Sequence, residues 1–260
     1  MKTILRNHIF VSALTLLAFG LAGCGNSTSP KPPVTPVAQI NFTIRAQTKF
    51  QQNYLDTTGG KYGNDSINTA SVDTLAQILD TTGLAYLGAT NVNRFLTNHS
   101  KPGVSQDTTN MYQVANGDLY TQDYGVEVLN NIPVVLAFNG GLKFHIGWVL
   151  QMKMAAPSGT PWLACDTGLG NLPFIGNIGI RDSATIMDDV VLNVAGEQLT
   201  TKHAVHNVTV TSSLAIARTR IDTYVSLKYG TVYNVVHSSQ LTGSFTNHVV
   251  GVRTILLTHS

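Results

Sequence analysis

The C-terminal third of the chain alternates apolar and polar side chains with the period of a β-strand. One parity holds Ala217, Thr219, Ile221, Thr223 and Val225, and the other holds Arg218, Arg220 and Asp222. Successive side chains of a strand point to opposite faces, so this period of two predicts a half-buried strand. Residues 187–258 as a whole predict a run of strands, with a turn at 228–230, a return strand at 231–237 and a last strand at 247–258.

Further strands are predicted upstream. Alternation over 40–46 predicts a first strand, and Asn116-Gly117 between two apolar runs predicts a two-residue hairpin turn. A longer hairpin is expected over 133–154. The Gly- and Pro-rich stretch 157–179 is expected to interrupt the sheet.

Two helices are expected near the N-terminal end of the folded region. Apolar residues recur at helical spacing over 72–82, with Ser71 as a cap and Gly83 at the end, and a second short helix is expected at 90–98. No strand–helix alternation suggests a parallel sheet, which disfavours dinucleotide-binding folds. The expected fold class is therefore α+β, a single domain with a largely antiparallel β-sheet and one or two N-terminal helices.

The first 24 residues have the order of a secretory signal. Lys2 and Arg6 form a basic start, residues 9–21 are mostly apolar, and small residues lead to Cys24. This apolar run of 13 residues is shorter than the ~20 that a membrane-spanning helix needs.

Its ending, Leu21-Ala22-Gly23-Cys24, resembles the lipobox of bacterial lipoproteins. The resemblance implies cleavage before Cys24, acylation of Cys24 with palmitate among the acyl chains, and anchoring in the bacterial cell envelope. Gly25 stands where Asp would mark the inner membrane, which implies the outer membrane if the host has one, on its periplasmic or surface side. The expected organisation is a signal peptide at 1–23, an acylated cysteine with a Pro/Ser/Thr-rich tether at 24–38, and a β-rich domain at 39–260.

Composition narrows the expected partners. The chain has 16 Lys+Arg and 14 Asp+Glu, and because Lys2 and Arg6 lie in the signal, the rest carries 14 of each. No basic block occurs, so no nucleic-acid partner is expected. The expected partners are the membrane, through the lipid on Cys24, and an unknown envelope protein or small ligand.

Two adjacent residues are weak catalytic candidates. Asp166-Thr167-Gly168 resembles the Asp-Thr-Gly loop of aspartic proteases, in which two carboxylates share one proton. Leu169 departs from that family's pattern, and the nearest second aspartate, Asp182, lacks the glycine. Cys165 would be a nucleophile only with a base such as His close by, and otherwise it is a small side chain in a half-buried strand.

His203 and His206 are weak metal candidates. On a helix, H-x-x-H would place both rings on one face, but Val205, Val208 and Val210 indicate a strand, where positions i and i+3 face opposite ways. The glycine-rich stretches lack the frame of a phosphate loop. We therefore expect no cofactor and no metal from this pair.

Residues 217–233 distantly resemble the end of envelope lipoproteins with a curved antiparallel sheet, although no family is recognised for the folded domain. The leading hypothesis is a lipid-anchored envelope protein of non-catalytic binding or structural type. Two alternatives remain, an anchored hydrolase that uses Asp166 or Cys165, and a subunit of a surface assembly.

Overall fold

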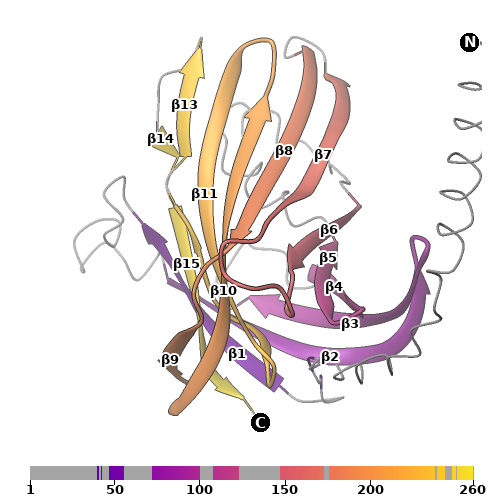
Figure 1. Ribbon diagram of the computed structural model, residues 1–260, viewed down its shortest axis with the longest axis vertical. Coiled ribbons are helices and arrows are strands. Elements are labelled where there is room, and N and C mark those ends of the chain that lie inside the picture. Colours follow the sequence, from indigo (N-terminus) through magenta and orange to yellow (C-terminus); the bar gives the residue numbers. More distant parts are fainter. Residues whose placement is uncertain are drawn as a thin grey trace, which may run out of the picture. The chain divides into compact units, whose positions relative to one another are not determined.

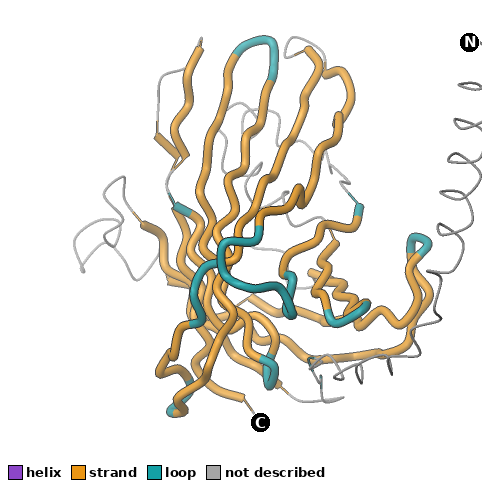
Figure 2. The backbone as a smooth tube through the Cα atoms, in the orientation of Figure 1, coloured by secondary structure: helices purple, strands orange, loops and turns teal. Residues whose placement is uncertain are grey.

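The computed structural model describes residues 40, 42, 47–55, 72–99, 108–122, 147–172, 176–237, 239–243, 248–249 and 251–259. The chain divides into two compact units, 1–36 and 37–260, and every described residue belongs to the second. The regular structure of these residues is β throughout, as Figure 2 shows. In this described part there is accordingly no helix long and apolar enough to cross a membrane. The expected α+β class is therefore wrong, and the described domain is all-β.

Six strands form the N-terminal part of the sheet. They are β1 (Gln47–Leu55), β2 (Val72–Tyr86), β3 (Ala89–His99), β4 (Thr108–Ala115), β5 (Asp118–Gln122) and β6 (Trp148–Met152). Nine more follow: β7 (Pro161–Leu172), β8 (Gly176–Ile186), β9 (Val190–Val194), β10 (Glu197–Thr211), β11 (Ala215–Ser226), β12 (Gly230–Val236), β13 (Ser239–Gly243), β14 (His248–Val249) and β15 (Gly251–His259).

All of these strands belong to one sheet whose described pairings are antiparallel. The main path runs β6-β5-β4-β3-β2-β1-β15-β12-β11-β10-β8-β7, with β9 paired to β10 and β13 paired to β11. In Figure 1 the β2–β3 hairpin sweeps sideways and bends at its tip, while β7, β8, β10 and β11 rise together as long ribbons. The two ends of the path come together, because the indole Nε1 of Trp162 in β7 donates to the carbonyl of Leu150 in β6 (3.0 Å).

The segment expected to be a helix at 72–82 is β2, and the one expected at 90–98 is β3. The two strands pair with each other around a turn at Leu87 and Gly88, both of which have positive φ. Gly83 does adopt the left-handed backbone expected of a helix cap (φ 71°), but it does so where the β2–β3 register shifts. Pairing of β2 with both β1 and β3 satisfies its backbone on two sides, and this tertiary context overrides the local helical spacing.

The expected interruption at 157–179 is also wrong, because most of it forms the β7–β8 hairpin. The glycines are accommodated by irregularities in the ladder. One register shift lies between Gly168 and Gly170, and Gly170 has a φ of 99° that suits glycine. A second shift, between Leu163 and Cys165, lies beside the polar cluster described below.

Several expectations are confirmed. Asn116 and Gly117 both have positive φ and join β4 to β5, with Ala115 opposite Asp118. The C-terminal strand β15 lies inside the sheet, paired with β12 on one side and β1 on the other. The strand expected at 40–46 and the hairpin expected over 133–154 fall largely outside the described residues.

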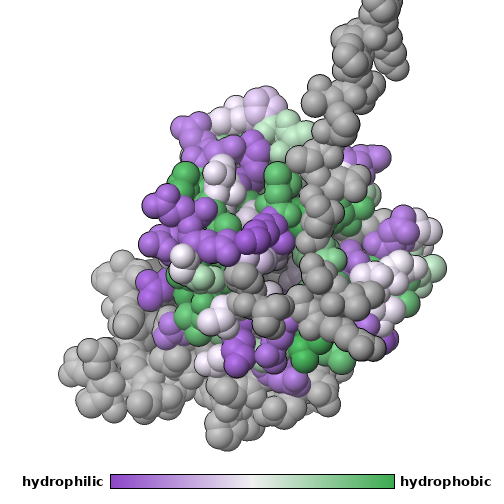
Figure 3. All heavy atoms as spheres, turned by 90° about the horizontal axis from the view of Figure 1, so that it is seen from below, coloured by the Kyte–Doolittle hydropathy of each residue, from purple (hydrophilic) through white to green (hydrophobic). Residues whose placement is uncertain are grey.

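The core lies between the two ends of the curled sheet. Leu119 of β5 and Met152 of β6 pack against Trp162, Ile186 and Val225 of the long strands. A second cluster, with Phe50, Val232 and Leu256 among its members, lies where β1, β12 and β15 meet the β9–β10 hairpin. On the face that Figure 3 shows, hydrophobic residues are interspersed with hydrophilic ones.

Candidate functional site

The long strand β10 carries polar groups on both of its faces. His203 contacts Asp222 of β11, whereas His206 contacts Asp182 of β8. His206 and its partner are almost fully buried, and His203 lies on the opposite, outer face. The two histidines therefore point away from each other, as their spacing on a strand predicts. Among the described residues, no group of three or more metal-ligating side chains has the geometry of a metal site.

The inner cluster is a buried chain of hydrogen bonds. Nδ1 of His206 lies 2.9 Å from Oδ2 of Asp182, and Nε2 lies 2.9 Å from the carbonyl oxygen of Gln151. The Trp162 ring meets the imidazole edge-on, with ring centroids 5.6 Å apart. Gln151 is skipped in the β5–β6 register, and the imidazole bonds its carbonyl oxygen.

The hydrogen-bond partners of His206 determine which of its ring nitrogens must carry a proton. A carbonyl oxygen can only accept, so Nε2 of His206 carries a proton that it donates to Gln151. The contact between Nδ1 and Asp182 then holds one further proton, on either the imidazole or the carboxyl group. In both arrangements the pair has no net charge, which is how a buried His and Asp avoid the cost of an isolated charge.

Cys165 lies directly opposite Asp182 in the β7–β8 ladder. Burial raises the pKa of its thiol to about 11, with further contributions from the charges of Asp182 and Asp166. The thiol is therefore protonated at neutral pH. Both ring nitrogens of His206, the histidine that contacts Asp182, are already hydrogen-bonded. The nucleophilic role of Cys165 stays a prediction, and this environment does not favour it.

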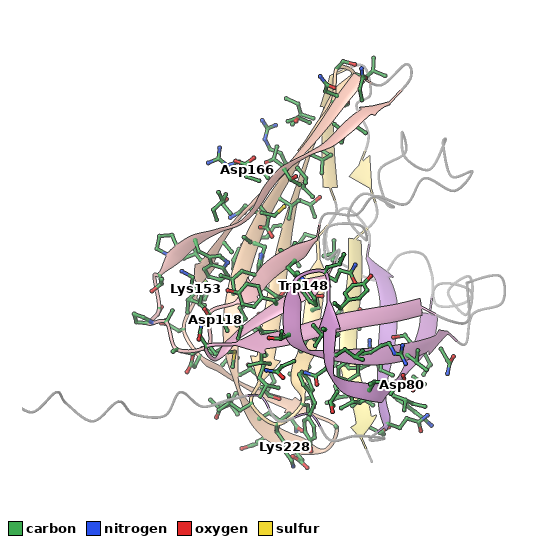
Figure 4. All side chains as sticks on the ribbon, turned by 90° about the vertical axis from the view of Figure 1, so that its right-hand side faces the viewer. Asp80, Asp118, Trp148, Lys153, Asp166 and Lys228 are labelled. Atoms are coloured by element: carbon green, nitrogen blue, oxygen red, sulfur yellow. The ribbon has the colours of Figure 1, made fainter. Side chains whose placement is uncertain are left out.

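Asp166 lies on the exposed side of β7, opposite Arg181 of β8. Figure 4 shows it on the outside of the long strands. Its carboxylate is 55% exposed and 3.9 Å from the Arg181 guanidinium, which is 68% exposed. Asp182, the second aspartate considered in the sequence, points into the core instead. Because one carboxyl group faces solvent and the other faces the core, this arrangement does not favour a proton shared between Asp166 and Asp182.

The outer cluster is centred on Asp222, whose side chain is only 8% exposed. Its Oδ1 accepts from Nε2 of His203 (2.9 Å) and Nη2 of Arg220 (2.8 Å). Its Oδ2 accepts from Nε of Arg220 (2.9 Å) and Nε2 of His237 (2.6 Å). Burial alone would raise the pKa of Asp222, but the hydrogen bonds from His203, Arg220 and His237 outweigh it and hold that pKa well below its usual value.

Aromatic rings extend this cluster across the outer face. The His203 imidazole stacks on the Tyr224 ring, with centroids 4.2 Å apart and planes within 5°. Tyr224 in turn contacts Tyr233 of β12 at 5.3 Å. Because Tyr224 pairs with His203 on one side and Tyr233 on the other, the ladder itself places the three rings in a row.

Beyond the cluster, the same face of β8, β10 and β11 carries polar side chains that point to solvent. We call these residues the arginine face, and they are Arg181, Ser183, Asn207, Thr209, Arg218 and Arg220. Arg220 links the arginine face to the outer cluster through its two hydrogen bonds to Asp222.

From the sequence, Asp182 was considered only as the second aspartate of a protease pair, and no functional role was assigned to Asp222 or to the arginines. Asp222 alternates with the apolar positions in the same way as Arg218 and Arg220, so the sequence predicts that it faces solvent. The local signal was Arg220-x-Asp222, because same-face neighbours two residues apart on a strand can form an ion pair. The lipobox and Cys24 lie outside the described residues.

The chain was also compared with known proteins. It matches no protein-family model and no curated protein. Three solved structures resemble it at low sequence identity. One is a candidate lipoprotein from Parabacteroides distasonis ATCC 8503, with a TM-score of 0.49 and 10% identity over 84% of this chain and 96% of that one.

The second is a candidate exported protein with a YmcC-like fold from Bacteroides fragilis NCTC 9343, with a TM-score of 0.49 and 8% identity over 86% of this chain and 99% of that one. The third is the hypothetical lipoprotein YmcC from Escherichia coli K12, with a TM-score of 0.32 and 13% identity over 84% of this chain and 89% of that one.

Proposed function

We propose that this chain is a lipid-anchored protein of the bacterial cell envelope that acts by binding rather than by catalysis. The observation that carries the proposal is the N-terminal order of basic start, apolar run and Leu21-Ala22-Gly23-Cys24, followed by a proline-rich tether. Two or more acyl chains on Cys24 would hold the domain stably at a membrane, because a single chain gives only marginal attachment.

The environments of the reactive side chains favour binding over catalysis. His206 is enclosed in the core, with both ring nitrogens hydrogen-bonded. The Cys165 thiol is protonated at neutral pH, and Asp166 is exposed beside an arginine. By contrast, the arginine face presents hydrogen-bond donors to solvent. These features favour a protein that binds a ligand or partner through its outer surface.

The test is fractionation of cells that express the full chain and its Cys24→Ser variant, with Cys165→Ser as the matched control. The wild type and Cys165→Ser should incorporate a labelled palmitate analogue and sediment with membranes. Cys24→Ser should take up no label and should remain unprocessed or soluble. A Cys24→Ser protein that still matures and sediments with membranes would exclude acylation at this position.

A separate experiment, in a host with two membranes, tests which of the two membranes holds the protein. Because Gly25 follows Cys24, the wild type should fractionate with the outer membrane on a density gradient. Recovery in the inner membrane alone would refute the outer-membrane assignment while leaving the anchor intact.

A further inference from the structure

We propose that the arginine face binds an extended polyanion, a chain molecule that carries repeated carboxylate or phosphate groups. This deepens the proposed function by naming the ligand class of the outer surface, and it rests on that function being one of binding. Three of the chain's seven arginines, Arg181, Arg218 and Arg220, lie on this one face.

The strand register sets the spacing of these cations. Arg181 of β8 pairs with Thr209 of β10, which pairs with Arg218 of β11. One rung along, Ser183 pairs with Asn207, and Asn207 pairs with Arg220. Neighbouring strands are about 4.8 Å apart and same-face residues about 7 Å apart along a strand, so the backbone positions of the arginines are separated by about 7–12 Å.

These arginines are available to a ligand. Arg181 and Arg220 are 68% and 54% exposed, and Arg218 is exposed as well. The contact of Arg181 with Asp166, at 3.9 Å, is longer than a hydrogen bond and lies in solvent, so it competes weakly with a ligand. Within the described ranges Arg218 makes no ion pair. The residues between the arginines are Ser183, Asn207 and Thr209, whose side chains can also donate to oxyanions.

Asp222 prepares Arg220 for this role. Nε and Nη2 of Arg220 donate hydrogen bonds to the Asp222 carboxylate, which fixes the plane of the guanidinium group. Nη1 is left to bind a ligand. The hydrogen bond to Asp222 raises the pKa of Arg220, so the cation is kept at every physiological pH. The negative charge of Asp222 is itself buried and satisfied by four hydrogen bonds, which limits its repulsion of an incoming anion.

A chain molecule fits this arrangement better than a membrane surface. Surfaces that dock on bilayers insert aromatic or aliphatic side chains. The six residues of the arginine face are polar, and the exposed Leu163, opposite Ser183, and the ring of Tyr224 lie beside them. Guanidinium groups bind carboxylates and phosphates in a two-pronged geometry, and a polymer with repeated charges can engage several of them at once. A single small anion can bridge fewer of them, because their backbone positions lie about 7–12 Å apart.

The experiment measures binding of the acylated full chain, held in neutral detergent micelles, to fluorescent poly-glutamate and to inorganic polyphosphate. The test variant is Arg181→Gln/Arg218→Gln, which spares Arg220 because Arg220 also holds Asp222. The control is Arg94→Gln, since Arg94 is a part-exposed arginine of β3 that pairs with Asp80. Wild type and control should bind at least one polymer, with affinity that falls as salt rises.

The double variant should bind about 10–30-fold more weakly at low salt, because each cation near an anionic surface contributes about 1 kcal/mol. Binding of poly-glutamate alone or of polyphosphate alone identifies the anionic group. The proposal is overturned if neither polymer binds, if the double variant binds as well as the control, or if only vesicles with anionic lipids bind. The anchor is tested by fractionation of Cys24→Ser, so the two proposals fail in different assays.

Discussion

The buried contact between His206 and Asp182 should make the two residues unequal in their effect on stability. His206 is fully buried and Asp182 is 3% exposed, so neither can be rescued by water when its partner is removed. We would replace each by an apolar residue of similar size, His206→Leu and Asp182→Val, and combine them in a double-mutant cycle.

The structure sets the order of the losses. His206→Leu leaves the Asp182 carboxyl group buried without its partner, which costs about 1–3 kcal/mol if that group is protonated and about 3–5 kcal/mol if it is ionised. It also removes the donor to the Gln151 carbonyl, which adds about 1–3 kcal/mol. Asp182→Val leaves a neutral imidazole that keeps its Nε2 hydrogen bond, so only Nδ1 loses its partner, at about 1–3 kcal/mol.

The double variant should be more stable than His206→Leu alone, because no unpartnered carboxyl group remains in the core. Urea unfolding followed by far-UV circular dichroism, in one detergent for all four proteins, gives the free energies of unfolding. Losses that add to within about 0.5 kcal/mol would show that the pair is not coupled. A larger loss for Asp182→Val than for His206→Leu would refute the protonation argument.

Three further predictions use other parts of the structure. The pKa of Asp222 is held below its usual 3.8, so its stabilising effect is complete above that pH and is lost as the pH falls toward the lower folded value. Urea midpoints should therefore fall less between pH 7 and pH 3 for Asp222→Asn than for wild type, and equal falls would contradict this. In Cys24→Ser, alkylation of Cys165 by iodoacetamide should be slow at pH 8 and should accelerate toward pH 11, whereas rapid labelling at pH 8 would show an activated thiol. Leu79→Ala, at a position 1% exposed, should cost about 2–5 kcal/mol of unfolding free energy. Leu87→Ala, at a position 57% exposed, should cost less than about 0.5 kcal/mol, and equal losses would place Leu79 outside the core.

The β-rich half of the chain was predictable because its signals are local. The positive φ angles at Asn116 and Gly117 follow from the turn chemistry of that dipeptide. The parity of β11 follows from alternation, since Ala217 to Val225 at every second position are buried. The helix prediction for 72–82 was wrong because apolar residues three and four apart can also occur in a strand. Nothing in the local sequence showed that this segment pairs with β1 and β3.

The candidate site was less predictable because its contacts are long-range. Asp182 and His206 are 24 residues apart, and His206 reaches a carbonyl 55 residues away. Asp222 looked solvated because its parity faces outward, and only the approach of His203, His237 and Arg220 from three positions buries it. Single residues indicate which chemistry is available, but the register decides which groups meet.

The two histidines of β10 also bear on how the sheet chooses its alignment during folding. A one-residue slip would turn the apolar face outward, but a two-residue slip keeps every side chain on its face, and the Val-x-Val pattern of β10 cannot reject it. His206 meets a carboxylate on β8 and His203 meets one on β11, so a slip against either neighbour breaks a specific bond. Loss of both histidines would therefore favour misaligned sheets with exposed edges, and the visible consequence would be slow, heterogeneous refolding with aggregation.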